Sequence, residues 1–255
     1  MSSDIWTPDA LSSEQHPYKG LVWRLVEAQH SVSTLTLVDT LSEQKLLEEL
    51  IEETKPAVPV KCRSLDFLLS TPFRYGAAYP HGSRFRKAGM SMGVFYASEY
   101  VRTALSEMVF YRVLFFSESP LTPWPKKPME FTAFSASVST VKAIDLTKPP
   151  LSEAARLWTH PDRYGPCQEL ADHAREAGID LIRYQSVRDP DGGRNIAILE
   201  CDVFAKPAPI DRQTWHLRFS SYGVQAICEF PRDSIEYPKE NFRKDKRTKK
   251  LDWDR

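Results

Sequence analysis

Four side chains between residues 84 and 107 could together bind a phosphorylated, positively charged substrate. Arg84 and Arg86 offer planar forks of N–H donors, which suit a diphosphate. Tyr96 presents an aromatic face on which a flat or cationic ring can stack. Glu107 supplies a carboxylate, which can stabilise positive charge and accept a hydrogen bond from a ribose hydroxyl. The same residues also allow a plainer interpretation, in which Glu107 and an arginine form a structural ion pair beneath an aromatic ring.

A second polar segment, residues 182–195, could belong to the same site. Ser186 follows an apolar run and precedes a turn rich in Asp and Gly, where a serine often only caps the turn. No Ser–His–Asp arrangement surrounds it, so the sequence does not predict an acyl-transfer nucleophile. Neither GxGxxG nor GxxxxGK[ST] occurs, so neither a Rossmann nor a P-loop nucleotide site is supported.

The residues around Glu107 predict a strand followed by a helix. Residues 93–97 have the apolar character of a short buried strand, and Ser98 is the expected N-cap of a helix over residues 99–112. Glu107 then neighbours the apolar face of this helix, where an unpaired carboxylate is costly. Residues 113–116 are expected to return to a strand. The two arginines and the tyrosine nearby in the sequence, Arg84, Arg86 and Tyr96, could supply a partner for Glu107 or share a pocket with it.

The rest of the chain mixes helical and extended patterns. Residues 41–54 form the clearest helix, because Leu46, Leu47, Leu50 and Ile51 fall on one face with acids opposite. A second helix is expected over residues 166–177, with Gly178 just past its end, and strands over residues 20–30 (or a short helix), 130–138, 141–146, 181–184, 195–201 and 215–230. This order predicts an α+β fold.

Composition and charge exclude several classes of protein. The 255 residues are 42% apolar, which is ordinary for a globular protein, and the formal net charge is zero. The overall charge therefore does not favour binding to nucleic acid or to an anionic membrane. No apolar run approaches the roughly 20 residues of a membrane helix, and the first ten residues lack a signal-peptide pattern. We therefore expect a protein that stays in the cytoplasm without membrane contact.

The cysteines and the two ends of the chain carry weaker predictions. The four cysteines are widely spaced and are expected to be reduced, mostly buried thiols, with no metal site. The first 18 residues are expected to form a loosely held lead-in. The basic run at 243–250 is expected to be a solvated, frayed end, and one short tail is thin evidence for direct nucleic-acid binding.

Two segments of this chain resemble the RES domain family, which is named for an arginine, a glutamate and a serine. The segment GSRFRKAGMSMGVFYASEYVRTALSE matches the family's Gly-x-Arg-aromatic start, its Tyr-x-Ala strand end and its Ala-Leu-x-Glu helix. Its matching residues are Gly82, Arg84, Phe85, Gly89, Tyr96, Ala97, Ala104, Leu105 and Glu107. The segment GIDLIRYQSVRDPDGGRNIAIL resembles the family's serine segment through Tyr184, Ser186, Arg188 and Asn195.

The resemblance implies an ADP-ribosyltransferase-like fold, a mixed β-sheet core with flanking helices. We assign this catalytic domain to residues 61–235, after a partly helical N-terminal extension at 1–60 and before a basic tail at 236–255. The segment departs from the family at Arg86, where an asparagine is common, so either Arg84 or Arg86 is the functional arginine. Arg84 is favoured because it keeps register with Gly82 and Gly89.

The resemblance also implies cleavage of the nicotinamide–ribose bond of NAD, which is a substrate here and not a bound cofactor. The implied catalytic residues are Glu107, Arg84 and Ser186, and the implied NAD-binding residues are Tyr96, Arg86, Arg188, Tyr184 and Asn195. Members of the family act as toxins that an Xre-like antitoxin neutralises by covering the site.

Three functions stay open at this point. The first is degradation of free NAD by hydrolysis, or by phosphorolysis with inorganic phosphate. The second is transfer of ADP-ribose to a protein through the same site. The third is a non-catalytic interaction protein in which an Arg–Glu pair is structural. The sequence leaves the acceptor, the identity of the antitoxin and the question of homo-oligomers open.

Overall fold

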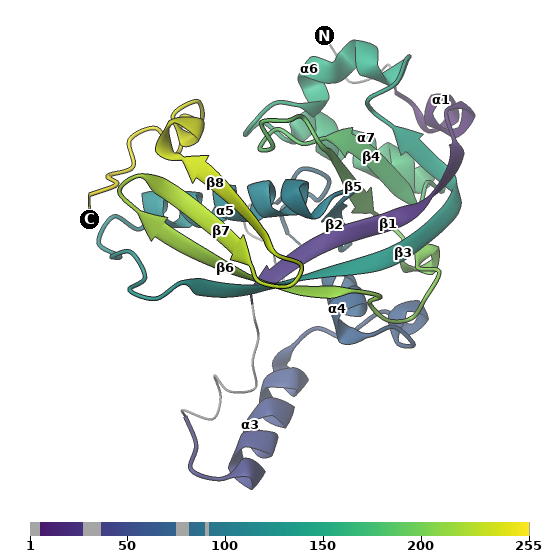
Figure 1. Cartoon of the computed structure of the whole chain (residues 1–255). Helices are drawn as coiled ribbons and strands as arrows, with labels where there is room; N and C mark the ends of the chain where they lie inside the picture. The colour runs from purple at the N-terminus through teal and green to yellow at the C-terminus, as the bar shows by residue number, and fades with distance from the viewer. Residues whose placement is uncertain (1–5, 28–36, 75–81, 90–91, 255) are drawn as a thin grey trace.

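Eight strands build one mixed β-sheet in the part of the chain that the structure describes, residues 6–27, 37–74, 82–89 and 92–254 of a computed structural model (Figure 1). The strands are β1 (His16–Glu27), β2 (Phe95–Ser98), β3 (Met129–Asp145), β4 (Leu181–Gln185), β5 (Arg194–Ile198), β6 (Arg212–Ser220), β7 (Gly223–Cys228) and β8 (Asp233–Pro238). Helices lie among these strands in the sequence, so the mixed helix-and-strand architecture predicted from the sequence is confirmed.

Five of the strands close into a ring. β1 pairs with both β2 and β3, and the order β1-β2-β5-β4-β3 returns to β1. β3 and β4 are parallel, whereas the other pairs of the ring are antiparallel. The first residues of β3, 129–134, also pair with β6. β7 and β8 follow β6 and extend the sheet as further antiparallel strands (Figure 1).

Two helices cover the sheet and determine where the polar segments meet. Helix α5 (Val101–Glu118) packs Leu105, Val109 and Val113 against buried residues of β3 and β6. Helix α7 (Gly165–Glu176) packs its apolar face on β4 and β5. Shorter helices are α1 (Pro8–Ser13), α4 (Phe67–Ser70) and α6 (Ala155–Trp158). The ends of β4 and β5 therefore lie between α5 and α7.

Helix α3 (Leu41–Thr54) has the predicted bounds but not the expected surroundings. Thr40 and Glu43 form a reciprocal capping box that starts it. In Figure 1 the helix extends away from the sheet. Leu46 and Leu50 are 56% and 51% exposed, so the apolar stripe that predicted the helix is not buried against the described residues.

Several expected boundaries are wrong, each because tertiary packing overrides a local signal. Residues 113–116 continue α5 instead of forming a strand, because Val113 and Phe116 extend its buried face. The two expected runs at 130–138 and 141–146 are the single strand β3. The expected strand over 215–230 is the hairpin β6–β7, and β8 was not predicted.

The two ends of the chain are more ordered than expected. Residues 8–13 form α1, whose Leu11 is fully buried and packs near α7, whereas residues 1–5 lie outside the described residues. The strand expected at 20–30 is β1, and residues 28–30 also lie outside the described part.

The basic run at 243–250 is packed and not frayed. It follows the 3₁₀ helix at Lys239–Phe242, and it alternates exposed basic side chains with the buried residues Asp245 and Thr248. The Thr248 hydroxyl donates to the Phe242 carbonyl (2.6 Å), and the Trp253 ring packs on Trp124. Apolar anchors at both ends of the run therefore hold it on the protein.

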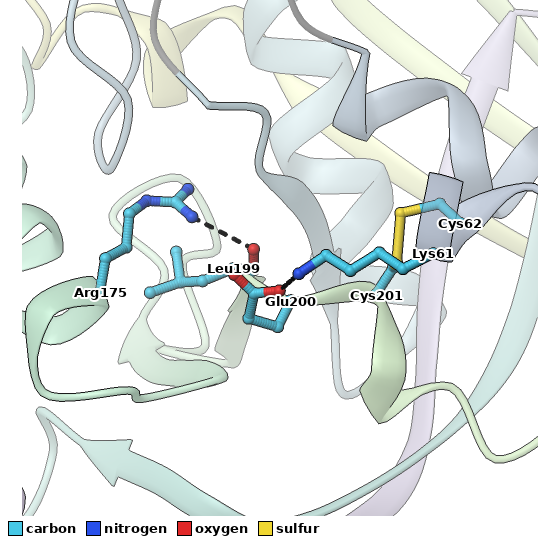
Figure 2. Close-up of a disulfide and its surroundings, with 6 residues drawn as sticks. All are labelled: Lys61, Cys62, Arg175, Leu199, Glu200 and Cys201. Atoms are coloured by element: carbon cyan, nitrogen blue, oxygen red, sulfur yellow. Dashed lines mark hydrogen bonds and ion pairs between the residues drawn. A yellow bond between two sulfur atoms is a disulfide. The ribbon is translucent and has the colours of Figure 1, made fainter. Parts of the chain in front are cut away.

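Two of the four cysteines form a disulfide, which corrects the expectation of four thiols. Cys62 and Cys201 lie in two 3₁₀ helices, Val60–Cys62 and Cys201–Val203, and their sulfurs are bonded. Figure 2 shows the neighbouring Lys61–Glu200 ion pair, so adjacent residues on both segments are joined. Widely spaced cysteines carry no sequence signal for this pairing, because the fold alone brings the segments together. Cys167 and Cys228 are buried free thiols.

No helix in the described ranges has the length and apolar character needed to cross a membrane.

Candidate active site

The Glu107 carboxylate is held by two neutral hydrogen-bond donors. Oε1 accepts from the Ser186 hydroxyl at 2.7 Å and from the Asn195 side-chain amide at 2.6 Å. Within the described residues no salt bridge joins Glu107 to a basic side chain. Ser186 and Asn195 are almost fully buried, at 3% and 2% exposure, while Glu107 is half-buried. Among the described residues, therefore, the contacts that hold this carboxylate come from neutral groups.

Asn195 is oriented by the strand next to it. β2 and β5 pair with Ser98 opposite Asn195, and the Ser98 hydroxyl donates to Asn195 Oδ1 at 2.7 Å. Because the amide oxygen is occupied, its NH₂ group faces Glu107. Ser98, predicted as a helix cap, instead ends β2, and the N-cap position Tyr100 has no side-chain cap.

Ser186 is oriented by the turn that follows it. Its Oγ accepts from the backbone N–H groups of Arg188 (3.2 Å) and Asp189 (3.0 Å), so its proton is directed to Glu107. The turn closes where Thr103 of α5 donates to Asp189 Oδ2 at 2.7 Å. A Cβ at Gly193 would lie 2.2 Å from Thr103 Oγ1, so only glycine allows this close approach.

Tyr184 links the glutamate to the arginine segment. It is buried in β4, pairs with Asn195 across the sheet, and packs edge-on against Phe85 with ring centroids 4.9 Å apart. Burial raises the pKa of Tyr184 well above its usual value, and the charge of Glu107 raises it further while that of Arg84 lowers it. Tyr184 therefore lies within electrostatic range of both predicted catalytic charges.

Arg84 is buried without a carboxylate partner among the described residues. Its Nη1 donates to the Trp158 carbonyl at 2.6 Å, and its guanidinium lies over the Tyr164 ring at 4.8 Å. The Cys167 thiol lies beside the same nitrogen at 4.0 Å. A guanidinium held by a carbonyl and an aromatic ring keeps its full positive charge, which suits an anionic ligand.

Tyr96 fixes the turn that carries Arg84. Its hydroxyl contacts Ser83 Oγ at 2.8 Å and accepts from the Phe85 backbone N–H at 2.9 Å. Gly82 opens this turn at φ +63°, and a Cβ there would lie 2.8 Å from the Arg86 carbonyl oxygen. The hydroxyl of Tyr96 is therefore engaged by the protein.

The two remaining predicted arginines lie in different surroundings. Arg86 is half-buried, and its carbonyl accepts from Gln168 Nε2 at 3.1 Å. Arg188 is 5% exposed, donates to Asp245 at 2.8 Å and stacks on Phe110 with its guanidinium 3.6 Å from the ring centroid. The guanidinium of Arg188 is therefore already occupied by protein groups.

Sequence reasoning did not assign a role to two further basic residues near the site. Arg24 of β1 donates to the Tyr96 carbonyl at 2.7 Å and lies over the Phe95 ring. Burial lowers the pKa of Arg24 to about 10. Arg247 of the C-terminal tail binds Asp245 and lies 5.3 Å from the Phe110 centroid. The sequence signal for Arg24 was its position as a charged residue inside the apolar run of β1. No feature of the neighbouring sequence indicated that Arg247 lies near the site.

The chain belongs to the RES domain family. A family model described as RES domain matches residues 58–220, which include every predicted site residue. A search of curated proteins gave no significant match. Among solved structures, the crystal structure of the M. tuberculosis MbcT–MbcA toxin–antitoxin complex is similar, with 11% identity and a TM-score of 0.47. That alignment covers 83% of this chain and 92% of the other.

Proposed function

We propose that this protein cleaves the nicotinamide–ribose bond of NAD and acts as the toxin of a toxin–antitoxin pair, with an ADP-ribosyltransferase-like core. One observation supports this most strongly: Glu107, with no basic partner among the described residues, is held by Ser186 and Asn195 close to the buried Tyr184. Arg84, whose charge also lies within electrostatic range of Tyr184, has no carboxylate partner in the described structure. Membership of the RES domain family supports the same reaction.

The two charged side chains of the site, Glu107 and Arg84, suit the ribose and the diphosphate of NAD. Nicotinamide is already cationic and leaves without protonation, so the C1–N bond breaks through an oxocarbenium-like state, as in glycoside hydrolysis. Glu107 accepts from the ribose 2′-hydroxyl and stabilises the developing positive charge. Arg84 binds the diphosphate, and the ring of Tyr96 packs against nicotinamide.

Ser186 and Asn195 supply positioning in this proposal. Both donate to the same oxygen of Glu107, so they hold the carboxylate in one orientation and leave its other oxygen for the ribose. Water or inorganic phosphate then attacks the ribose C1 while the bonding electron pair leaves with nicotinamide. Arg86 is the arginine that we assign to recognition of the phosphate acceptor or of the diphosphate.

The partner that we propose is a small Xre-like antitoxin that covers the site. Such a partner would explain how a cell tolerates an enzyme that consumes NAD. Its binding is expected to block NAD hydrolysis by purified protein in proportion to the complex formed.

Product analysis by NMR tests the proposed reaction. Purified, antitoxin-free protein is incubated with NAD in buffers with and without inorganic phosphate. Release of nicotinamide together with ADP-ribose, or with ADP-ribose 1-phosphate when phosphate is present, is the expected result. Nicotinamide release only when lysate protein is added, with labelled ADP-ribose on protein, would instead indicate a protein ADP-ribosyltransferase. No nicotinamide release under any of these conditions would refute the proposal.

A further inference from the structure

The C-terminal tail, which follows the RES domain match at 58–220, reaches back to the site through one buried carboxylate. Asp245 is 7% exposed and binds two arginines at once. Arg188 Nη1 lies 2.8 Å from Oδ2, and Arg247 binds both carboxylate oxygens through Nη2 (2.9 Å) and Nε (3.0 Å). The Arg247 backbone N–H adds a further bond to Oδ1 at 2.9 Å.

Each of the two arginines also binds a second group. Both guanidinium groups donate to the Pro161 carbonyl, Arg247 at 3.0 Å, and Arg188 through its other terminal nitrogen. Both also lie over the Phe110 ring, three residues after Glu107 on α5. Asp245 thus joins the tail, the loop before α7 and the helix that carries the glutamate.

Arg188 connects this cluster directly to the catalytic serine. Its backbone N–H is one of the two that donate to Ser186 Oγ, and so the position of Arg188 determines where the hydroxyl points. Asp245 is the carboxylate partner of this buried guanidinium, and removing one partner of a buried ion pair is destabilising because the other charge is left uncompensated. Without Asp245, the long side chain of Arg188 would gain rotamer entropy by moving to solvent, and the 186–189 turn would lose its anchor.

We propose that Asp245 is a positioning residue of the active site: it holds Arg188 on Phe110 and thereby keeps the Ser186–Glu107 hydrogen bond in register. This inference rests on the proposed function and reassigns Arg188, whose donors are occupied, from binding NAD to supporting Ser186. It also gives residues that follow the matched domain a part in the reaction.

Asp245→Asn tests the proposal, with Asp252→Asn as the matched control because it removes an exposed carboxylate from the same tail. The expected result for Asp245→Asn is a roughly 10- to 100-fold loss of kcat, with KM for NAD little changed. Asp245→Glu, which keeps the charge, is expected to recover most of the activity. Asp252→Asn is expected to behave as wild type.

A double-mutant cycle shows whether Asp245 acts through Arg188. If it does, Asp245→Asn combined with Arg188→Ala loses no more activity than Arg188→Ala alone. Losses that multiply would overturn the proposal, because they would mean that Asp245 affects the reaction independently of Arg188. Thermal unfolding of each variant shows whether the fold is kept, and kcat is compared per folded molecule.

Hydrogen exchange separates this inference from the proposed function. The Arg188 and Asp189 amides, which donate to Ser186, are expected to exchange roughly tenfold faster in Asp245→Asn than in Asp252→Asn. Unchanged exchange of these amides would refute the positioning role even if NAD is the substrate. Faster exchange in a protein that proves inactive on NAD would refute only the proposed function.

Discussion

Two glutamates of one strand–helix segment, Glu99 and Glu107, are held in contrasting ways. Glu99, just after β2, binds Arg183 through both of its oxygens at 2.7 and 2.9 Å, and Arg183 also binds Asp145 at 3.0 Å. Glu107, two turns into α5, is held by a hydroxyl and an amide. An arginine binds the first carboxylate, whereas among the described residues only neutral donors bind the second.

The difference separates a structural role from a catalytic one. The sequence left open that an Arg–Glu pair in this region is structural, and the structure contains such a pair, but it is formed by Arg183 and Glu99. A carboxylate that an arginine already binds in bidentate fashion has little attraction left for a cationic substrate. A carboxylate oriented by neutral groups can stabilise positive charge as it develops. The comparison therefore supports the proposed role of Glu107 in the reaction and a structural role for Glu99.

Replacing Glu107 by Gln gives the largest effect that we expect. The change keeps the shape and removes the charge, so NAD cleavage should fall roughly 1,000-fold, which corresponds to about 4 kcal/mol of transition-state stabilisation. The thermal midpoint should change little. The glutamine side-chain oxygen can accept the same hydrogen bonds from Ser186 and Asn195, and no buried cation loses its partner. Steady-state nicotinamide release and a melting curve measure both quantities. Wild-type turnover in this variant would end the catalytic assignment.

Replacing Glu99 by Gln should show the opposite pattern. Arg183 then loses its bidentate partner in a partly buried position, where the two side chains are only 20% and 21% exposed. Unfolding free energy should fall by about 2–3 kcal/mol, while kcat per folded molecule stays near that of wild type. Urea unfolding followed by tryptophan fluorescence measures the loss. A large drop in kcat without destabilisation would contradict the division of roles.

The smallest expected effect is a pH dependence of stability that comes from Asp145, the second carboxylate bound to Arg183. Burial alone would raise the pKa of Asp145, but hydrogen bonds from Thr147 and the charge of Arg183 lower it below its usual value. A carboxyl with a lowered folded-state pKa stabilises the protein above its unfolded pKa, near 4, and loses that contribution as the pH falls further. Asp145→Asn should therefore be less stable than wild type at pH 6.

The same difference should shrink as the pH is lowered from about 4 towards 2, because the wild-type carboxyl then becomes protonated. Urea midpoints at a series of pH values test this, and Asp202→Asn, an exposed aspartate, is the control. A difference between Asp145→Asn and wild type that stays constant across this range would contradict the assignment.

The predicted residues of the site came from motifs, and the fold brings the serine, glutamate and asparagine into direct contact. Glu107 neighboured an apolar helical stripe, which correctly indicated that it needs a partner. The partners come from β5 and from the turn after β4, and no periodicity in the sequence reveals which strand lies beside which. The catalytic roles of Glu107, Arg84 and Ser186 and the NAD-binding roles of the other residues remain predictions.

The failed predictions share one physical cause. Local patterns describe which residues prefer a helix, a strand or solvent, whereas distant packing decided the outcome at residues 113–116, at Cys62 and Cys201, and in the basic tail. The tail shows this most clearly, because its charge predicted exposure while Asp245 and Trp253 anchor it. Long-range partners of this kind cannot be read from one sequence.

The Cys62–Cys201 bond closes residues 62–201 into a covalent circle, with β1 before it and β6, β7 and β8 after it in the chain. Its 139-residue separation spans all eight residues predicted for the site, from Arg84 to Asn195. A single cut by a protease anywhere inside this circle would open it into one longer chain and release nothing. Both halves of the proposed catalytic apparatus would stay tethered after such a cut, so damage to a surface loop need not separate Glu107 from Ser186.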